Sequence, residues 1–435
     1  MTQIKNNWIR RLYTMDNLPV LRSIDSETVD LIYLDPPFNS GKQWENPIGA
    51  GNKRALASFK DTWELSDTHA DEEYELSLVC PEAIRLIDAL HEINGGSWKA
   101  YLIYMGARLA EMHRILKPTG SIYYHCDPVM SHGVKLLMDA LFGGQSSGKI
   151  GGHFRNEIVW CYSGGGVSKR DFPRKHDIIL RYTKHKTWVY NVEYKSYKEN
   201  TQQVGKHSTY SGGPDIDLKR GVPVTDWWTD IKTITGWLRS QERTGYPTQK
   251  PLALLERIIK TSSQKGSLVL DPFCGCATTC LAAERLERQW IGIDLAEKAA
   301  TLIHDRLQRE GEGLDIIAHE VEYLCHLPKR TDLDGLRSDD ASLKRKLYMS
   351  QDKKCLGCEE EMPIERMNID HIIAKNRGGQ NVDNNIQLLC GNCSSIKGNR
   401  GMNYLWQKHL KRRTEEKMRE YEKTRRKQAE DRQQD

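Results

Sequence analysis

The chain has 435 residues, a hydrophobic content of 38% and a formal net charge of +5, so we expect two or three domains rather than one. No apolar run approaches the roughly 20 residues that a membrane-spanning helix needs, and the N-terminus lacks the apolar core of a signal peptide. Eleven cysteines are an odd number, which favours thiols or metal ligands in a reducing, cytoplasmic compartment over disulfides. These features argue against a membrane protein and against a disulfide-stabilised secreted protein.

The first elements of the chain predict a strand that carries a rigid lip. A strand and then a helix are expected over residues 11–23, with Asp16 or Asn17 as the helix cap. β-forming apolar residues then predict a buried strand over residues 29–34. It runs into the Asp-Pro-Pro-Phe sequence of residues 35–38, whose prolines remove backbone donors and stiffen the chain.

Such a lip at the carboxyl end of a strand lies where open α/β sheets bind ligands. It offers an acceptor-only carboxylate, bare carbonyl oxygens and an aromatic face, which suits a flat heterocycle that carries an amino group. Taken alone, the same residues also suit an ordinary strand-ending turn.

The next stretch alternates between helix and strand patterns. Residues 41–60 are glycine-rich and basic without periodicity, which predicts a mobile loop beside the lip. A helix is expected over residues 99–116, and strands are expected over residues 121–127, 156–163 and 177–183. This alternation predicts the α/β fold class.

The regular pattern fades between residues 184 and 243, where aromatic side chains stand among many lysines and arginines. Rings interleaved with cations suit contacts with nucleic-acid bases and phosphates. The alternative is a loop-rich insert whose aromatic side chains pack its own small core. These residues are Trp188, Tyr190, Tyr194, Tyr197, Tyr210, Trp227, Trp228 and Trp237.

A second ligand-binding pattern follows. An amphipathic helix within residues 245–263 precedes a buried strand, a Cys-Gly-Cys-Ala turn at residues 274–277 and a helix that begins with small residues. The glycine lets the backbone approach a ligand, and the helix N-terminus supplies N–H donors. The next strand ends at Asp294, about 20 residues after the turn, the usual spacing for an acid that holds ribose hydroxyls.

The motif at residues 35–38 and the turn at residues 271–277 together resemble the amino-methylating DNA methyltransferases, in the form usual for N6-adenine enzymes. The resemblance covers residues 11–307, and the order of the motifs resembles the circularly permuted β group. It implies a Rossmann-like, S-adenosylmethionine-dependent methyltransferase with a recognition segment inserted between its halves. Ala277 departs from the family, where a glycine is usual.

The resemblance also implies roles for individual residues. The amine of a base flipped out of double-stranded DNA would donate to the Asp35 carboxylate and the Pro36 carbonyl, with its ring on Phe38. The implied catalytic residues are Asp35, Pro36, Pro37 and Phe38. The implied cofactor-binding residues are Asp16, Asp271, Phe273, Gly275, Thr278 and Asp294.

The C-terminal part has a different character. Two CxxC pairs, Cys355 with Cys358 and Cys390 with Cys393, are typical of a tetrahedral structural zinc site. The sequence around and between them, over residues 355–400, resembles the ββα-metal module of HNH endonucleases.

The HNH resemblance implies a nuclease site. His371 would activate water, Asp370 would bind Mg²⁺ or Mn²⁺, and Asn385 would position the His371 loop. Ser394 stands where His or Asn is usual, so weak metal binding and slow cleavage are expected. The alternative is a zinc module that only binds DNA or a partner.

The expected divisions of the chain follow these motifs. They are 1–183 for the catalytic half, 184–244 for target recognition, 245–309 for the cofactor half, 310–345 for a linker, 346–402 for the HNH-like zinc module and 403–435 for a charged helix or tail.

The expected function is site-specific methylation of adenine N6 in DNA, with an HNH-like domain that cleaves or only binds DNA. Three alternatives stay open. They are an HNH restriction-type endonuclease that uses the methyltransferase half for recognition, an N4-cytosine methyltransferase, and a DNA-binding protein with both sites decayed. Contact with a membrane is not expected. The sequence leaves open the recognition site, formation of a homodimer and RNA as a substrate.

Overall fold

The computed structural model describes residues 8–47, 56–143, 153–163, 169–196, 221–234, 242, 244, 246, 248–309, 320–333, 341–382 and 385–431. The chain forms two compact units. Unit 1 comprises Met1–Asn17, Asp25–Glu64 and Cys80–His326, and unit 2 comprises Leu18–Ile24, Leu65–Val79 and Leu327–Asp435. In the described part of the chain, no helix has the length and apolarity needed to cross a membrane.

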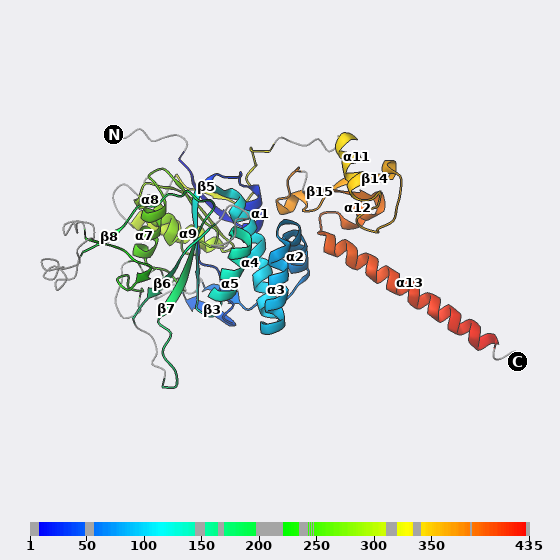
Figure 1. Cartoon of the computed structure of the whole chain (residues 1–435), viewed down its shortest axis with the longest axis horizontal. Helices are drawn as coiled ribbons and strands as arrows, with labels where there is room; N and C mark the ends of the chain where they lie inside the picture. The colour runs from blue at the N-terminus through cyan, green and yellow to red at the C-terminus, as the bar shows by residue number, and fades with distance from the viewer. Residues whose placement is uncertain are drawn as a thin grey trace, which may run out of the picture. The chain divides into compact units, whose positions relative to one another are not determined.

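Unit 1 is built on a nine-stranded sheet of order β10-β6-β7-β5-β2-β11-β12-β1-β13 (Figure 1). Strand β7 runs antiparallel to β5 and β6, and the other neighbours are parallel. The strands are β1 (Arg10–Thr14), β2 (Val29–Leu34), β5 (Leu116–Cys126), β6 (His153–Cys161), β7 (His176–Thr183), β10 (Trp227–Trp228), β11 (Leu268–Asp271), β12 (Gln289–Asp294) and β13 (Glu322–Leu324).

The central pairing of this sheet explains where its ligand site lies. Strands β2 and β11 are parallel neighbours, with Leu31 opposite Val269 and Ile32 opposite Leu270. Their carboxyl ends therefore meet at one edge of the sheet. The Asp-Pro-Pro-Phe lip and the Cys-Gly-Cys-Ala turn, which follow these strands, are brought together there.

Helices cover both faces of the sheet because successive side chains of a strand point to opposite sides. Tyr33 of β2 belongs to a buried cluster with Ile258 and Leu281. The hydroxyl of Tyr124 in β5 lies 2.7 Å from that of Tyr101 on the other face. Figure 1 shows the sheet between the two helix groups. These are α3 (Pro81–Asn94), α4 (Gly96–Ile115) and α5 (Ser131–Phe142), and α7 (Leu252–Ser262), α8 (Thr278–Arg285) and α9 (Glu297–Arg309).

Several predicted elements are confirmed, and two predictions are wrong. In the mobile loop expected over residues 41–60, the described residues form an antiparallel pair of β3 (Lys42–Pro47) and β4 (Leu56–Asp61), because cross-strand hydrogen bonds order strands that lack hydrophobic periodicity. Residues 48–55 lie outside the described residues. The linker expected over residues 310–345 contains β13, which pairs with β1 and extends the sheet. Residues 310–319 and 334–340 lie outside the described residues.

Unit 2 has a small antiparallel pair, β14 (Met367–His371) and β15 (Ile386–Cys390), followed by α12 (Gly391–Lys397) and the long α13 (Met402–Asp431). It also holds α11 (Ala341–Ser350), α2 (Asp67–Val79) and most of α1 (Asn17–Ser23). Tyr74 of α2 packs edge-on against Trp406 of α13, with ring centroids 4.8 Å apart. The unit therefore includes two segments that the sequence assigned to the catalytic half. The short strands β8 (Tyr194–Lys195) and β9 (Val222–Pro223) pair in unit 1.

Candidate active site

A cavity of about 610 Å³ opens in unit 1 and is lined by residues that follow β2, β11 and β12. Most of the site residues predicted for unit 1 lie on its wall, which brings the lip and the turn into one space. These residues are Asp35, Pro36, Pro37, Phe38, Asp271, Phe273, Gly275, Thr278 and Asp294.

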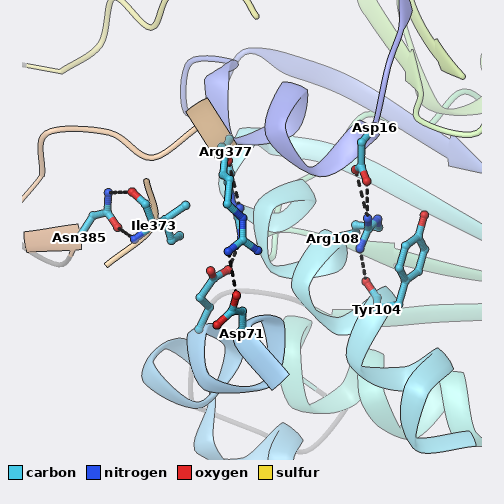
Figure 2. Close-up of polar contacts among 9 residues, drawn as sticks. Asp16, Asp71, Tyr104, Arg108, Ile373, Arg377 and Asn385 are labelled. Atoms are coloured by element: carbon cyan, nitrogen blue, oxygen red, sulfur yellow. Dashed lines mark hydrogen bonds and ion pairs between the residues drawn. The ribbon is translucent and has the colours of Figure 1, made fainter. Parts of the chain in front are cut away.

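Asp16 is placed differently from the other predicted cofactor residues. Its half-exposed carboxylate pairs with the buried Arg108 guanidinium at 3.1 Å, and it is not among the residues that line the cavity (Figure 2). The neighbouring Asn17 lines the cavity instead, and its amide donates to the Pro272 carbonyl at 2.8 Å. This hydrogen bond from Asn17 holds the turn after β11 in place within unit 1.

Two residues of the turn after β11 adopt the left-handed backbone conformation. Gly275 has φ +52°, and a Cβ there would lie 2.9 Å from the Tyr246 ring, so glycine is needed. Ala277 also adopts the left-handed conformation, with φ 55°, which costs a residue with a Cβ roughly 1–2 kcal/mol. The turn therefore forms despite the missing glycine. Asp294 accepts hydrogen bonds from the Gly275 and Ala296 amides, both at 2.8 Å.

Asp271 is a buried carboxyl group beneath this turn. It accepts hydrogen bonds from the Thr279 hydroxyl at 2.5 Å and the Phe273 amide at 3.0 Å. Burial raises the pKa of Asp271 to about 7 in spite of these two donors. Burial likewise raises the pKa of Asp294, against the opposing effect of its two amide donors. The turn thus holds two carboxyl groups whose ionisation is disfavoured until a cation or a donor arrives.

The lip presents Asp35 to the same cavity. Its Oδ2 lies 2.5 Å from Lys250 Nζ, and the two side chains are 17% and 10% exposed. Its Oδ1 is buried and has no hydrogen-bond partner among the described residues. The Phe38 ring stacks on His125, with centroids 6.2 Å apart and planes 24° apart.

A polar network behind Phe38 was not found from the sequence. Tyr33 Oη lies 2.9 Å from His125 Nδ1, His125 Nε2 lies 3.1 Å from Asp177, and the Tyr162 hydroxyl donates to Asp177 at 3.0 Å. Burial raises the pKa of Asp177, but His125, the charge of Lys250 and the hydrogen bond from Tyr162 together lower it, and the net pKa is lowered. The signal that could have revealed these residues is their place in the predicted strands, since strand ends on one edge converge.

The aromatic residues of the predicted recognition segment divide into two kinds. Trp228 is buried and packs in the core of unit 1, with the Arg257 guanidinium 5.1 Å from its ring. Trp227, beside it, is 63% exposed. The Arg155 guanidinium lies 3.5 Å from the centroid of Trp188. Part of the predicted segment lies outside the described residues, including Tyr197, Tyr210 and Trp237.

In unit 2, the four predicted thiols gather at one point. The sulfur atoms of Cys355, Cys358, Cys390 and Cys393 all lie within 4.8 Å of one another. Backbone amides donate hydrogen bonds to these sulfurs. Cys390 N lies 3.2 Å from Cys355 Sγ, and Cys393 N lies 3.4 Å from Cys390 Sγ. His409 Nε2, which the sequence did not single out, lies 3.2 Å from Cys393 Sγ.

The polar residues on β14 and its following loop form a second cluster in unit 2. His371 Nε2 lies 2.5 Å from Asn381 Oδ1. Asn385 accepts from the Ile373 amide at 2.8 Å and donates to the Ile373 carbonyl at 3.1 Å (Figure 2). The Asn385 side chain therefore holds the backbone of the loop that follows His371.

Asp370 already has two partners. Its Oδ1 lies 2.9 Å from the ammonium of Lys397, which is 1% exposed, and its Oδ2 accepts from the Ser394 hydroxyl at 2.8 Å. Both partners lie on α12, which begins directly after Cys390.

Residues 29–305 match the DNA methylase family, and residues 355–400 match the HNH endonuclease family. The chain belongs to the DNA methylase family and carries a C-terminal HNH domain.

Two proteins of similar sequence are named as methyltransferases. The chain is 26% identical over 309 residues to the type II methyltransferase M.HpaI of Haemophilus parainfluenzae, covering 71% of this chain and 77% of the relative. It is 28% identical over 319 residues to the DNA adenine methyltransferase YhdJ of Escherichia coli (strain K12), covering 72% and 86%. Among solved structures, the M1.HpyAVI–SAM complex is 19% identical with a TM-score of 0.39, covering 68% of this chain and 98% of that one.

The methylase cavity fits S-adenosylmethionine. The buried carboxyl groups of Asp271 and Asp294 suit a ligand that carries positive charge and hydroxyl groups, and the bare backbone at Gly275 allows close approach. The four thiols of the HNH domain fit a tetrahedral zinc ion. The surroundings of Asp370 do not fit Mg²⁺ or Mn²⁺, because the ammonium of Lys397 already occupies the carboxylate on which such an ion would depend.

Proposed function

We propose that this methyltransferase acts on adenine N6 of a base flipped out of double-stranded DNA. The observation that carries the proposal is that Asp35 lines the same cavity as the cofactor turn at Gly275 and Asp294, and that none of the described residues pairs with its Oδ1. An amino group inside a base pair is inaccessible, so the base has to leave the duplex to reach Asp35. The name of the relative YhdJ supports adenine as the target.

The chemistry follows from the acceptors on the lip. When bound, S-adenosylmethionine supplies an electrophilic methyl group on a positively charged sulfur. The base amine donates one N–H to Asp35 and one to the Pro36 carbonyl, which turns the nitrogen lone pair toward the methyl. As the N–C bond forms, the S–C bond breaks and the positive charge passes to the nitrogen. That nitrogen then loses a proton to Asp35 or to water, and Phe38 holds the base ring throughout.

Cytosine N4 is the alternative target, because the same acceptors on Asp35 and Pro36 fit either exocyclic amine. The deciding experiment incubates the protein with methyl-labelled S-adenosylmethionine and genomic DNA from a methylation-deficient bacterial strain. Digestion to nucleosides and mass spectrometry should then find N6-methyladenine. Label in N4-methylcytosine would overturn the choice of base, and label on an RNA control alone would overturn DNA as the substrate.

The segment between the two motif halves is the proposed target-recognition element. Trp227 exposes 63% of its surface, and arginines lie over the rings of Trp188 and Tyr190. Exposed rings beside guanidinium groups are suited to stacking on bases and pairing with phosphates. Trp228 is assigned to the core instead, because it is buried.

A second candidate function is DNA cleavage by the HNH domain. The arrangement of His371 beside Asn381 and the loop held by Asn385 favour it. The ion pair between Lys397 and Asp370 weighs against metal-assisted cleavage, so cleavage is expected to be slow and the domain to act mainly as a DNA-binding module. A structural zinc ion at the four cysteines would hold this domain together.

A further inference from the structure

Lys250 joins the two halves of the methylase at the lip. It lies 215 residues after Asp35 in the chain, just before α7, and its Nζ is 2.5 Å from Asp35 Oδ2. Both side chains are largely buried, and both residues line the cavity. A lysine ammonium buried in this way requires a fixed partner, since desolvating an unpaired charge costs several kcal/mol.

The same lysine contacts the aromatic part of the lip. Its Nζ lies 5.5 Å from the centroid of the Phe38 ring, within the range of a cation–π contact. It also lies 3.4 Å from the carbonyl oxygen of Thr248, which adopts a φ of +60°. A β-branched residue in the left-handed region is unusual, and the surrounding contacts have to hold it there.

The two oxygens of Asp35 are therefore unequal. Oδ2 accepts from Lys250, whereas Oδ1 is buried and has no partner among the described residues. A buried acceptor without a partner is costly, and such atoms in a cavity wall are typical of sites that a ligand completes.

We propose that Lys250 is a positioning residue for methyl transfer, which holds Oδ2 of Asp35 so that Oδ1 faces the amine of the target base. This inference rests on the proposed function. Lys250 does not touch the reacting nitrogen; it fixes the rotation of the carboxylate and, through Phe38, the plane on which the base stacks. Without it, the carboxylate can rotate, and the amine loses its fixed acceptor.

A purely structural role for Lys250, as neutraliser of a buried carboxylate, predicts different behaviour. It would show as lower stability and weaker cofactor binding, with little specific effect on the transfer step. A double-mutant cycle separates the two roles. If Lys250 acts through Asp35, its substitution should have little further effect on the transfer rate once Asp35 is changed.

The experiment compares Lys250→Met, Lys250→Arg, Asp35→Asn and the double variant Asp35→Asn/Lys250→Met. Single-turnover transfer of labelled methyl to unmethylated genomic DNA gives the rate, calorimetry gives the dissociation constant for S-adenosylmethionine, and thermal unfolding reports the fold. Lys265→Met serves as the control, since Lys265 is 71% exposed and pairs with Glu287 at the surface.

We expect Lys250→Met to slow transfer about 100-fold, as misplacement of a reacting group does, with the cofactor dissociation constant within about threefold of wild type. Lys250→Arg should restore most of the rate, and Lys265→Met should leave it unchanged. On the Asp35→Asn background, Lys250→Met should cost less than about threefold.

A Lys250→Met variant as fast as wild type would overturn the inference, as would a rate loss that is the same on the Asp and Asn backgrounds. A cofactor affinity that falls as far as the rate would also overturn it. Absence of transfer by the wild-type protein would instead overturn the proposed function, and the role of Lys250 with it. The two failures are thus distinguished by the wild-type rate.

Discussion

Ionisation of the buried Asp271 carboxyl group should lower the free energy of unfolding of unit 1. Its pKa is raised by burial to about 7, whereas in the unfolded chain it lies near the reference value of about 3.9. Between these two values the folded state keeps its proton and the unfolded state loses it, so the free energy of unfolding falls as pH rises. Above pH 7 the full loss, on the order of 4 kcal/mol, is reached.

Asp271→Asn should remove this pH dependence, because the amide cannot ionise and still accepts from Thr279. Urea unfolding at several pH values between 4 and 8 measures it: the wild-type curve falls relative to the variant curve across this window. Asp88→Asn, at a half-exposed carboxylate paired with Lys99, is the matched control. Parallel curves for Asp271→Asn and wild type would contradict the prediction.

The roles proposed for Asp35 and Asp294 predict opposite phenotypes. Asp35→Ala should abolish methyl transfer and leave the dissociation constant for S-adenosylmethionine within a few-fold, because Asp35 faces the base. Asp294→Ala should weaken cofactor binding by about tenfold or more, the cost of removing a charged hydrogen-bond partner. Calorimetry and labelled transfer measure both quantities. Unchanged cofactor affinity in Asp294→Ala would contradict the role of Asp294 in binding the ribose hydroxyls.

The sequence identified site residues that belong to contiguous motifs and missed those that come from distant parts of the chain. Asp35 directly follows one predicted strand and Asp294 ends another, so their place at one sheet edge follows from the parallel order of the strands. Asp177 and Tyr162 lie at the ends of predicted strands, which hinted at the same sheet edge but not at their hydrogen bond. Lys250 lies outside any predicted motif, and its contact with Asp35 depends on packing between segments 215 residues apart. Asp16 was assigned by resemblance to the family, whereas the structure pairs it with Arg108.

At the level of elements, β14 and α12 bring Asp370 and Lys397 together in the HNH domain. If the lysine ammonium stands where a divalent ion would bind, its removal should raise metal affinity. We expect Lys397→Met combined with Ser394→Asn to bind Mn²⁺ at least about tenfold more tightly than wild type, the scale on which groups around a metal site act. Electron paramagnetic resonance of free Mn²⁺ measures the affinity directly.

Nicking of unmethylated plasmid in Mn²⁺ should increase in the same variant and disappear when His371→Ala is added. Lys411→Met, on the exposed face of α13, is the control for loss of a lysine charge. Zinc content and circular dichroism confirm that each variant folds. Equal Mn²⁺ affinity of wild type and the double variant would show that Lys397 does not compete with the metal.

Elements with strong internal periodicity were predicted well, and those stabilised only by pairing were not. Helix α4 and strands β6 and β7 follow from their apolar spacing. The β3–β4 hairpin has no such spacing, and its order comes from cross-strand bonds that join residues as far apart as Lys42 and Asp61. Strand β13 is three residues long and exists because the edge of β1 accepts it.

On the scale of the whole molecule, the chain does not divide into consecutive domains. Unit 2 gathers Leu18–Ile24 and Leu65–Val79 with Leu327–Asp435. Within it, Arg377 pairs with Asp71 at 2.9 Å (Figure 2). The sequence predicted a module beginning at residue 346 because its motifs lie there. The contributions of α1 and α2 come from helices without a sequence motif, so nothing in their residues marks the partner they pack against.

The composition of unit 2 predicts that a metal holds it together. The buried cluster around the cysteines is small, and half of its described members are thiols: Cys355, Cys358, Leu389, Cys393, Met402 and Leu405, with Tyr74 and Trp406 packed against it. The few apolar side chains of this cluster supply little folding energy around the cysteines, whereas four thiolates on zinc supply a large share in small domains. The purified protein should therefore contain one zinc ion per chain.

Removing that zinc should loosen α2 as well as the cysteine-bearing loops, because Tyr74 of α2 packs on Trp406 beside the cluster. Hydrogen exchange with and without a chelator tests this. Amides of Leu65–Val79 and of β15 should lose protection after chelation and in Cys393→Ser, while those of β2 should keep theirs. Protection of Leu65–Val79 that survives the loss of zinc would mean that α2 is stabilised without the cysteine cluster. Metal analysis that finds no zinc in the untreated protein would remove the basis of the prediction altogether.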